Sequence, residues 1–356
     1  MGLLRGAGPY LGEVDPADLL IAPGGERRFD FDGANRAQFA PARLLRGAIA
    51  APREFRAMIA LVRPQVVLSF LKGTNLIVWR ALAGMRGARP KWIAREGNNA
   101  LAVIREEAPF PLAARAVTAL TARAYRATDR VLAISYELAS DIARDLRLDP
   151  AKVSAIHNPI DIAAIRSAAR ERPSGLPRRP FILAAGRLER QKGFDLLLRA
   201  YAASRAAATH DLVILGEGSL DRGLRALANA RGIAAQVHWP GFQANPFSWM
   251  AACDVFVLPS RWEGFGNVLA EAMAAGAPAL AADCDYGPGE IVEHGESGWL
   301  VAPDSAEALA EGLRTLLGDA GLRARLADRG SRSVERFAIE TVLARYAALI
   351  EAVAAR

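Results

Sequence analysis

Short apolar runs alternate with longer helical patterns along this chain, and the alternation occurs in two series. A strand followed by a helix and another strand builds a parallel sheet with right-handed crossovers, so the sequence predicts an α/β fold. Helical patterns such as Phe194 to Arg205 and Leu220 to Arg231 fill the gaps. The predicted strands are residues 64–70, 91–95, 130–135 and 152–158 in the first series, then 181–186, 211–216, 236–241, 254–259 and 277–282 in the second.

A charged, proline-bearing stretch, RERPSGLPRRP at residues 170–180, separates the two series. The chain has 356 residues, which is enough for two domains of ordinary size. We therefore predict two Rossmann-like domains, residues 1–160 and 161–335, followed by an amphipathic helix at residues 336–356.

Composition limits the class of protein. Although 52% of the residues are hydrophobic, no apolar run approaches the roughly 18–20 residues that span a bilayer, and the N-terminus lacks the apolar core of a signal peptide. The two cysteines, Cys253 and Cys284, are too few for a disulfide framework, so we interpret them as reduced thiols. A cytoplasmic location is expected.

Positive charge is concentrated in the first part of the chain. Residues 1–160 hold 23 Lys and Arg against 15 Asp and Glu, a balance of +8, while residues 161–356 hold 22 against 23, a balance of −1. A basic half faces either an anionic partner, such as a membrane surface, or only solvent. The stretch at residues 112–130 is the best candidate for such a face, and it equally has the pattern of an ordinary surface helix. Its cations are Arg115, Arg123 and Arg126.

Two cations follow the first strand of the second series. In open parallel sheets, ligands bind beyond the carboxyl ends of the strands. The strand ends at Gly186, Arg187 and Lys192 follow in the loop, and a helix begins near Phe194. Two cations beside a helix N-terminus form a clamp for a diphosphate, with a pair of exposed surface cations as the alternative.

Glycines and an aromatic residue follow the next two strands. Gly216 and Gly218 either allow the backbone to approach a ligand closely or form only a tight turn. Phe242 is placed to stack on a nucleotide base, with a position in the core as the alternative.

The stretch RWEGFGNVLAEAMAAG, residues 261–276, carries two carboxylates. Glu271 lies inside a helix that is otherwise apolar, and a buried carboxylate needs partners, which a ribose diol provides. Glu263 lies before the helix, where a sugar attached to the diphosphate would reach. The alternative is that both glutamates face solvent. The first N–H groups of the helix, which can donate to a phosphate, belong to Gly266, Asn267 and Val268.

Together these segments resemble the family-4 retaining glycosyltransferases, which have two Rossmann-like domains facing a cleft (the GT-B architecture). The resemblance is close over about residues 180–340. In that family one glutamate contacts the donor sugar, a second contacts the ribose, and an arginine and a lysine neutralise the diphosphate. The resemblance implies Glu263, Arg187 and Lys192 as catalytic residues. It implies donor binding by Gly186, Gly216, Gly218, Phe242, Gly264, Phe265, Gly266, Asn267, Val268, Glu271, Gly287 and Pro288.

The segment DCDYGPGEIV, residues 283–292, is similar to a loop of family members that use UDP-sugars and build surface polysaccharides or lipid-linked oligosaccharides. The donor implied is a UDP-linked N-acetylhexosamine or galactose, although Asp285 replaces the usual proline. Glu290 lies at an expected helix start, where it caps free N–H groups.

Two Asp-x-Asp motifs match the cation site of the other major glycosyltransferase fold. They are Asp283 with Asp285, and Asp30 with Asp32. Because cations of the protein already neutralise the phosphates, we expect no metal and no other cofactor.

The first half resembles the family's acceptor domain through RPQVVLSFLKGTN, IAREGNN and SAIHNPID. Family members usually open with a strand and a glycine-rich loop, and this chain starts after that point, so the first β-α unit is expected to be missing. His157 is expected to be structural. The last helix, residues 336–356, packs back on the first domain in this architecture.

The resemblance implies transfer of a hexosyl group from a nucleotide sugar to a saccharide or polyprenyl-diphosphate-linked acceptor, with retention of configuration. No nucleic-acid partner is expected. A peripheral position on the inner face of the cell membrane accords with the basic half. The alternative from another class is a non-catalytic nucleotide-sugar-binding protein. A GT-B phosphorylase needs a much longer chain, and a dinucleotide dehydrogenase needs a G-x-G-x-x-G after a strand.

Overall fold

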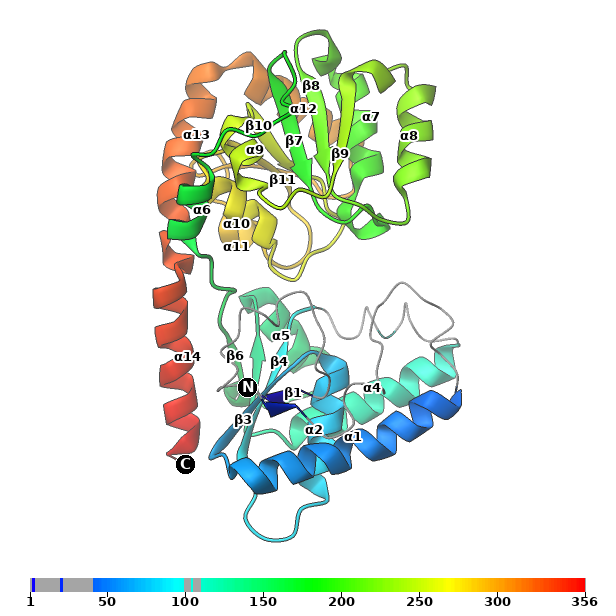
Figure 1. Cartoon of the computed structure of the whole chain (residues 1–356), viewed down its shortest axis with the longest axis vertical. Coiled ribbons are helices and arrows are strands. Elements are labelled where there is room, and N and C mark those ends of the chain that lie inside the picture. The colour runs from blue at the N-terminus through cyan, green and yellow to red at the C-terminus, as the bar shows by residue number, and fades with distance from the viewer. Residues whose placement is uncertain (1, 4–19, 22–40, 99–103, 105–109, 356) are drawn as a thin grey trace. The chain divides into compact units, whose positions relative to one another are not determined.

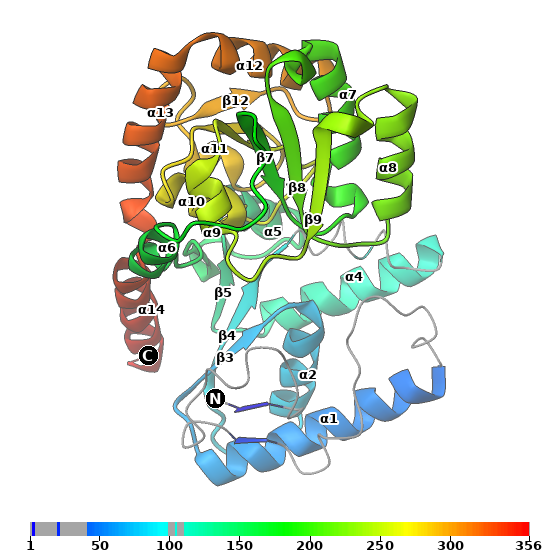
Figure 2. The same cartoon turned by 45° about the horizontal axis from the view of Figure 1, so that its top comes forward.

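The structure is a computed structural model that describes residues 2–3, 20–21, 41–98, 104 and 110–355. The chain forms two compact units (Figures 1 and 2). The first β-α unit was expected to be missing, and this prediction concerns a part of the chain that lies mostly outside the described residues. The predicted domain borders also remain a prediction. The first unit comprises Met1–Leu132, Ile142–Ser154 and Leu349–Arg356, and the second comprises Ala133–Asp141 and Ala155–Ala348.

The first sheet contains the four strands predicted for the first series, in the order β3-β4-β5-β6. Its first two strands pair in parallel, with Val66 opposite Lys91 and Phe70 opposite Arg95. A separate two-stranded sheet pairs β1 (Gly2–Leu3) with β2 (Leu20–Ile21). The bounds are β3 Val66–Phe70, β4 Lys91–Glu96, β5 Arg130–Ala133 and β6 Val153–Ala155, with helices α1 Pro41–Val62, α2 Lys72–Ala83, α4 Pro111–Arg126 and α5 Tyr136–Asp145 and a 3-10 turn at Pro150–Lys152.

A buried polar network lies in the core of the first unit. The side-chain amide of Asn75 donates to Glu96 Oε1 at 3.1 Å and to the Tyr125 hydroxyl at 3.0 Å. Ser69 Oγ donates to Asn75 Oδ1 at 2.7 Å, and Trp92 Nε1 donates to Ser69 Oγ at 2.8 Å. Burial raises the pKa of Glu96 to about 8, so this carboxyl group is mostly protonated at neutral pH.

The second sheet has six strands in the order β12-β11-β10-β7-β8-β9, and its pairs are parallel. The chain runs outward from β7 in one direction and outward from β10 in the other, so these two central strands form the topological switch point of a doubly wound sheet. The strands are β7 Phe181–Ala185, β8 Asp211–Leu215, β9 Val237–Gly241, β10 Val255–Leu258, β11 Ala279–Ala282 and β12 Trp299–Val301. The first five were predicted, and the three-residue β12 was not.

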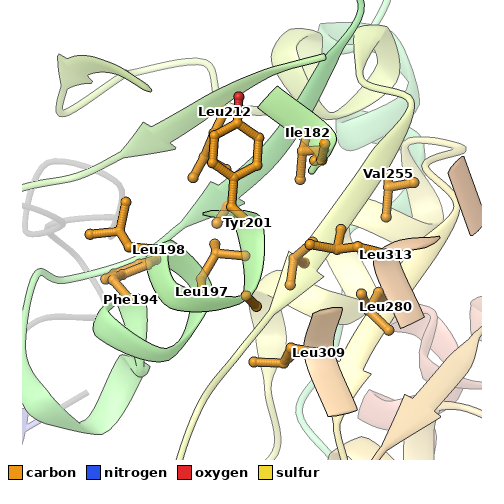
Figure 3. Packing of buried hydrophobic residues seen from close by; sticks show 14 of the residues in the cluster. Ile182, Phe194, Leu197, Leu198, Tyr201, Leu212, Val255, Leu280, Leu309 and Leu313 are labelled. Atoms are coloured by element: carbon orange, nitrogen blue, oxygen red, sulfur yellow. The ribbon is translucent and has the colours of Figure 1, made fainter. Parts of the chain in front are cut away.

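Both faces of the four central strands are buried, which explains why these strands are apolar apart from Asp211 at the start of β8. Successive side chains of a strand point to opposite faces. Ile182 and Leu212 therefore pack with Leu197 and Tyr201 of α7 and with Leu313 of α12 on one face (Figure 3). Their strand neighbours, such as Leu183 and Val213, are equally buried on the other face.

Helices α7 to α11 connect the strands of the second sheet, whereas α6 precedes β7, and α12, α13 and α14 follow β12. The end of α14, from Leu349, belongs to the first unit. The bounds of these helices are α6 Ile162–Ala168, α7 Phe194–Ser204, α8 Asp221–Ala230, α9 Phe247–Ala252, α10 Asn267–Ala274, α11 Pro288–Ile291, α12 Ala306–Gly318, α13 Ala320–Ser333 and α14 Ile339–Ala354. Short 3-10 turns occur at Arg190–Lys192, Ala206–Ala208, Ala234–Gln236 and Val334–Phe337. Within the described parts of the chain, no helix combines the length and the apolar character that a membrane crossing requires.

The last helix starts later than predicted. The pattern places a helix from residue 336, whereas α14 begins at Ile339 after a 3-10 turn. The backbone leaves the helical path at Ala338 because this residue bridges Ile160, whose N–H donates to the carbonyl of Phe337 at 2.8 Å. A contact distant in sequence therefore sets this boundary.

Candidate functional site

The candidate site lies at the switch point of the second sheet. Arg187 and Lys192 follow β7, and Glu263 and Glu271 follow β10, its neighbour in the sheet. The carboxyl ends of parallel strands meet at the same edge, which is where ligands bind in folds of this kind. The sheet order therefore brings two loops together that are about seventy residues apart in the sequence.

The loop after β7 places Lys192 against the rest of the site. The aliphatic stem of Lys192 passes beside Gly186, at a distance that leaves only van der Waals space for a Cβ there. Gly193, which follows, has a φ of 63°, and a Cβ at this position would collide with the carbonyl oxygen of Pro259. Glycine is therefore required for the loop to approach the end of β10.

Glu263 is a buried carboxylate with two donors. Lys192 Nζ donates to its Oε1 at 2.6 Å, and Ser260 Oγ donates to the same oxygen at 2.7 Å. The side chains of Lys192 and Glu263 are 15% and 7% exposed. An ion pair shielded from water to this extent is held firmly, because either charge would be costly to bury alone.

Glu271 lies in the second turn of α10 and is partly buried. Burial raises the pKa of its carboxyl group, and the positive charge of Lys192 partly offsets this effect. Lys192 therefore lies close enough to influence both glutamates. Among the residues that the structure describes, none hydrogen-bonds to the Glu271 carboxyl group, so its oxygens can accept from hydroxyl groups of a ligand.

The N-terminus of α10 offers backbone donors at the same place. Its N-cap, Gly266, has a φ of 93°, and no side chain of the described residues caps the helix. The N–H groups of Asn267 and Val268 are therefore available to an anion, which the positive end of the helix dipole also favours, whereas the N–H of Leu269 donates to the carbonyl of Gly266 at 2.9 Å. Asn267 is exposed, and its side-chain oxygen accepts from the Asn158 amide at 2.7 Å.

Other predicted site residues lie on the loops that follow β7, β8 and β9. Arg187 is exposed and donates to Gln191 Oε1 at 3.4 Å. At Gly216 a side chain would strike the backbone of Gly186, so this glycine permits the two loops to pack together. Phe242 is 74% exposed, which excludes a position in the core. Gly218 similarly packs against the backbone of Leu188.

The side chain of Phe265 is buried in the second unit, where it packs against other rings. It is 1% exposed, and its ring lies 5.1 Å from that of Phe337 and 5.3 Å from that of His157. Gly287 has a φ of 111°, and a Cβ there would collide with the carbonyl of Phe265, so the loop before α11 lies directly on the loop before α10. Gly264 and Pro288 are buried beside them.

Glu290 caps a different helix from the one predicted. Its carboxylate accepts the backbone N–H groups of Tyr136 and Glu137, at 3.0 and 2.9 Å, in the first turn of α5. His157 Nε2 lies 2.6 Å from the same carboxylate. The side chain of Glu290 reaches α5 because residues 133–141 fold into the second unit, and sequence distance conceals this contact. His157 thus has a structural environment, as expected.

Ser260 and Arg261 belong to the site and were not predicted. Ser260 is fully buried and holds Glu263, and Arg261 forms hydrogen bonds to the loop after β7. They lie three and two residues before Glu263, just after a strand end, and this position is the only signal that could have identified them. Sequence alone does not reveal their partners.

The structure describes one of the two Asp-x-Asp motifs. Asp283 and Asp285 are exposed, and within the described ranges no three His, Cys, Asp or Glu side chains converge as metal ligands do. Asp30 and Asp32 lie outside the described residues.

Comparison with protein-family models covers both halves of the chain. The model of the group 1 glycosyl transferases matches residues 167–333, and that of glycosyltransferase family 4 matches residues 19–164. The chain belongs to these glycosyltransferases. The residues at the switch point all lie within the group 1 match.

Named relatives are about a third identical to this glycosyltransferase over the aligned part of each chain. The N-acetylgalactosamine-N,N'-diacetylbacillosaminyl-diphospho-undecaprenol 4-alpha-N-acetylgalactosaminyltransferase of Campylobacter jejuni is 36% identical over 199 residues, 56% of this chain and 53% of the relative. The alpha-D-kanosaminyltransferase of Streptomyces kanamyceticus is 32% identical over 68% of this chain and 58% of the relative. The chain spans about half the length of the first of these relatives.

Solved structures show the same fold. HepE of Anabaena, crystallised in complex with UDP, superimposes with a TM-score of 0.73 at 20% identity, over 85% of this chain and 82% of that one. The apo lipopolysaccharide outer core galactosyltransferase WaaB gives 0.71 at 19% identity, over 99% and 89%. These likenesses, with the two parallel sheets, establish the GT-B architecture of two Rossmann-like domains.

Proposed function

We propose that this protein transfers a hexosyl group from a nucleotide sugar to a saccharide or lipid-linked acceptor, with retention of anomeric configuration. One observation carries the proposal. A buried lysine paired with a glutamate, a second carboxyl group without a hydrogen-bond partner among the described residues, and an uncapped helix N-terminus meet where β7 and β10 end. This set of groups complements a diphosphate that carries a sugar on one side and a ribose on the other.

Each group has a part in the proposed reaction. As the glycosidic bond breaks, negative charge builds on the diphosphate, and Lys192, Arg187 and the N-terminus of α10 stabilise it. An ammonium group has three N–H donors, so Lys192 can keep its hydrogen bond to Glu263 and also donate to a phosphate oxygen. Glu263 faces the sugar and stabilises positive charge at the anomeric carbon. Glu271 accepts from the ribose hydroxyls, and the leaving phosphate takes the proton of the acceptor.

Similar proteins support a choice of donor and acceptor class. Three similar structures contain UDP, UDP with glucose, or UDP-glucose, and the Campylobacter relative is named for a diphospho-undecaprenol acceptor. We therefore propose a UDP-hexose or UDP-N-acetylhexosamine as donor and a polyprenyl-diphosphate-linked saccharide as acceptor.

Donor binding and transfer can be measured separately. Thermal unfolding with UDP-, GDP- and ADP-sugars should show stabilisation by one class, expected to be UDP. Incubation with that sugar and undecaprenyl-diphosphate-linked saccharides should then give a product whose new linkage, by proton NMR, has the anomeric configuration of the donor. Binding without transfer to any acceptor would favour the non-catalytic alternative, and inversion would contradict the proposed mechanism.

We propose that no metal ion takes part. Lys192 and Arg187 supply positive charge that neutralises the diphosphate. A divalent cation neutralises the charge of the diphosphate in other transferases. Transfer should therefore continue in EDTA at an unchanged rate, and a loss that magnesium or manganese restores would contradict this.

One face of α4 is proposed to contact an anionic membrane. Phe110, Leu112 and Leu120 are 56%, 71% and 42% exposed, and the helix contains no acidic residue. An exposed stripe of apolar and basic side chains suits the interface of a membrane that carries negative lipids. The cations that accompany the apolar side chains on this helix are Arg115, Arg123 and Arg126.

Vesicle sedimentation tests this face. The protein should bind vesicles that contain phosphatidylglycerol and should bind neutral vesicles weakly. Arg115→Gln should weaken binding severalfold, since each cation near such a surface contributes about 1 kcal/mol. Arg222→Gln, which removes one exposed cation from α8, is the matched control and should leave binding unchanged. Equal binding to both kinds of vesicle would contradict the proposal, which places the enzyme on the cytoplasmic face of the membrane.

A further inference from the structure

We infer that Arg261 is a positioning residue, which holds the loop that carries Lys192 so that its ammonium group meets the diphosphate of the donor. The inference rests on the proposed function, because it concerns how the donor clamp is assembled. Arg261 itself contacts neither Lys192 nor Glu263 in the hydrogen bonds of the described residues, so any influence on them passes through the loop.

Arg261 joins the two loops of the site through its backbone and its side chain. Its N–H donates to the carbonyl of Gln191 at 2.8 Å, and its Nη1 donates to the carbonyl of Arg190 at 3.0 Å. In the opposite direction, the side-chain amide of Gln191 donates to the carbonyl of Trp262 at 2.9 Å. Gln191 directly precedes Lys192, so these contacts place the backbone from which the lysine side chain starts.

Asp195 anchors the other side of Arg261. The guanidinium group binds this carboxylate at two points, with Nη1 to Oδ1 at 2.8 Å and Nη2 to Oδ2 at 2.9 Å. Asp195 belongs to the first turn of α7, which begins two residues after Lys192. A forked pair of this kind fixes orientation as well as distance, and the ammonium group of a lysine cannot reproduce it.

The electrostatics of the pair agree with this geometry. Burial alone would raise the pKa of Asp195, but the hydrogen bonds and the charge of Arg261 outweigh burial and hold the pKa below its ordinary value. The Arg261 side chain is 14% exposed, so little water competes for the contact. Asp304 Oδ1 adds a further bond at 2.9 Å to Nε of Arg261.

The position of Lys192 matters because its charge acts over a short range. Its Nζ lies at the end of a flexible four-carbon stem, so the backbone of the loop decides where the charge can reach. Displacement of a charged group by about 1 Å is enough to lose much of its effect on a bound ligand. Arg261 therefore contributes to the phosphate contacts without touching the phosphate.

Binding calorimetry with a nucleoside diphosphate and its nucleoside provides the test. UDP, GDP and ADP are first compared on the wild type, and the tightest binder is used together with its nucleoside. Arg261→Lys and Asp195→Asn should each weaken the diphosphate about tenfold and leave the nucleoside within about twofold, because only the phosphates contact Lys192. Arg199→Ala is the matched control. It removes another ion pair of Asp195, at 3.2 Å, on an exposed part of α7, and it should change neither affinity.

A double-mutant cycle separates positioning from general damage. If Arg261 acts through Lys192, then Arg261→Lys should have no further effect on diphosphate affinity in a Lys192→Ala background. An equal loss in both backgrounds, or no loss in either, would overturn the inference while leaving the proposed function intact. A wild type that binds the diphosphate no more tightly than the nucleoside would instead contradict the proposed function, and the inference would fall with it.

Discussion

Lys192 is paired with one of the two glutamates of the site and acts electrostatically on the other. Its Nζ is 2.6 Å from Glu263 Oε1, and its charge lowers the pKa of Glu271 against the effect of burial. One ammonium group thus balances two carboxyl groups in a region with little water. A ligand that brings a diphosphate to this place finds the cation already oriented, which is what preorganised electrostatic stabilisation requires.

Replacement of this residue tests its role directly. Lys192→Ala should lower kcat by about a hundredfold to a thousandfold, the range typical of losing one fixed group that stabilises developing charge. The variant should be less stable, because Glu263 loses its ion pair, but circular dichroism at 25 °C should still show the native fold, since Ser260 retains its hydrogen bond to Glu263. Turnover near that of the wild type would show that the lysine does not serve the leaving group.

Glu96 is a residue whose charge state depends on burial rather than on a partner. Burial raises its pKa to about 8, whereas the unfolded chain loses this proton near 4.5. Between these two values unfolding releases a proton, so the contribution of Glu96 to stability is complete below pH 4.5 and is lost as the pH rises through about 8.

The variant Glu96→Gln removes this titration and keeps an oxygen for Asn75. The stability of the variant relative to the wild type should therefore rise with pH, by roughly 1 kcal/mol per pH unit across the window. Urea denaturation followed by circular dichroism at pH 5, 6, 7 and 8 measures the difference. A difference that does not change with pH would mean that the folded protein does not retain this proton.

At the scale of elements, the loops at the carboxyl ends of the strands are connected to one another rather than independent. Leu188 N–H donates to the carbonyl of Glu217, and Ser219 donates to Glu189 through both its N–H and its hydroxyl. Arg261 joins the same loop from the other side. The segment with Arg187 and Lys192 is therefore held between the loops after β8 and β10.

Helix α5 depends on a cap supplied from a distant segment. Burial alone would raise the pKa of Glu290, but the bonds from His157 and from the N–H groups of Glu137 and Tyr136 outweigh burial and hold the pKa below 4.5. A carboxyl group with a depressed pKa stabilises the fold above its unfolded value, and this stabilisation is lost as the pH falls through the folded value.

Glu290→Gln should therefore lower the free energy of unfolding at pH 7 by about 1 kcal/mol, the usual cost of a lost charged cap. The deficit should shrink as the pH falls below 4.5, the opposite trend to that of Glu96→Gln. Urea denaturation over the same pH series, extended to lower pH, measures the deficit of Glu290→Gln. A deficit that persists unchanged in acid would show that the charge of Glu290 is not what stabilises the helix.

At the scale of the whole molecule, the charge is uneven. The balance of +8 over residues 1–160 and −1 over residues 161–356 places the cations in the half that contains α4. Such a distribution attracts an anionic surface at long range and orients the protein as it approaches. In the membrane contact proposed above, the exposed apolar side chains on α4 would then supply contact at short range.

The salt dependence of vesicle binding follows from the separate roles of charge and apolar contact. Binding to anionic vesicles should weaken as sodium chloride rises from 0.1 to 1 M, because the screening length falls from about 10 Å to about 3 Å. Residual binding to neutral vesicles should not weaken. Anionic binding that is insensitive to salt would indicate that apolar insertion, and not charge, holds the protein on the membrane.

The sequence by itself determined the strands and the loops that follow them. Periodicity and chain order are local properties, so nine strands and the positions of Arg187, Lys192, Glu263 and Glu271 at strand ends could be predicted without any partner in view. The short strand β12 was not predicted, although β6, which is equally short, was, and the start of α14 depended on a bridge to Ile160.

Only the tertiary structure decided which of those groups meet. The order of the strands placed β7 beside β10 and so paired Lys192 with Glu263, while packing joined Arg261 to Asp195 and carried Glu290 to the start of α5. Each of these contacts spans more than sixty residues of chain. The physical reason is that hydrogen bonds and ion pairs act over a few ångströms of space, and no local pattern records which distant backbone will fill that space.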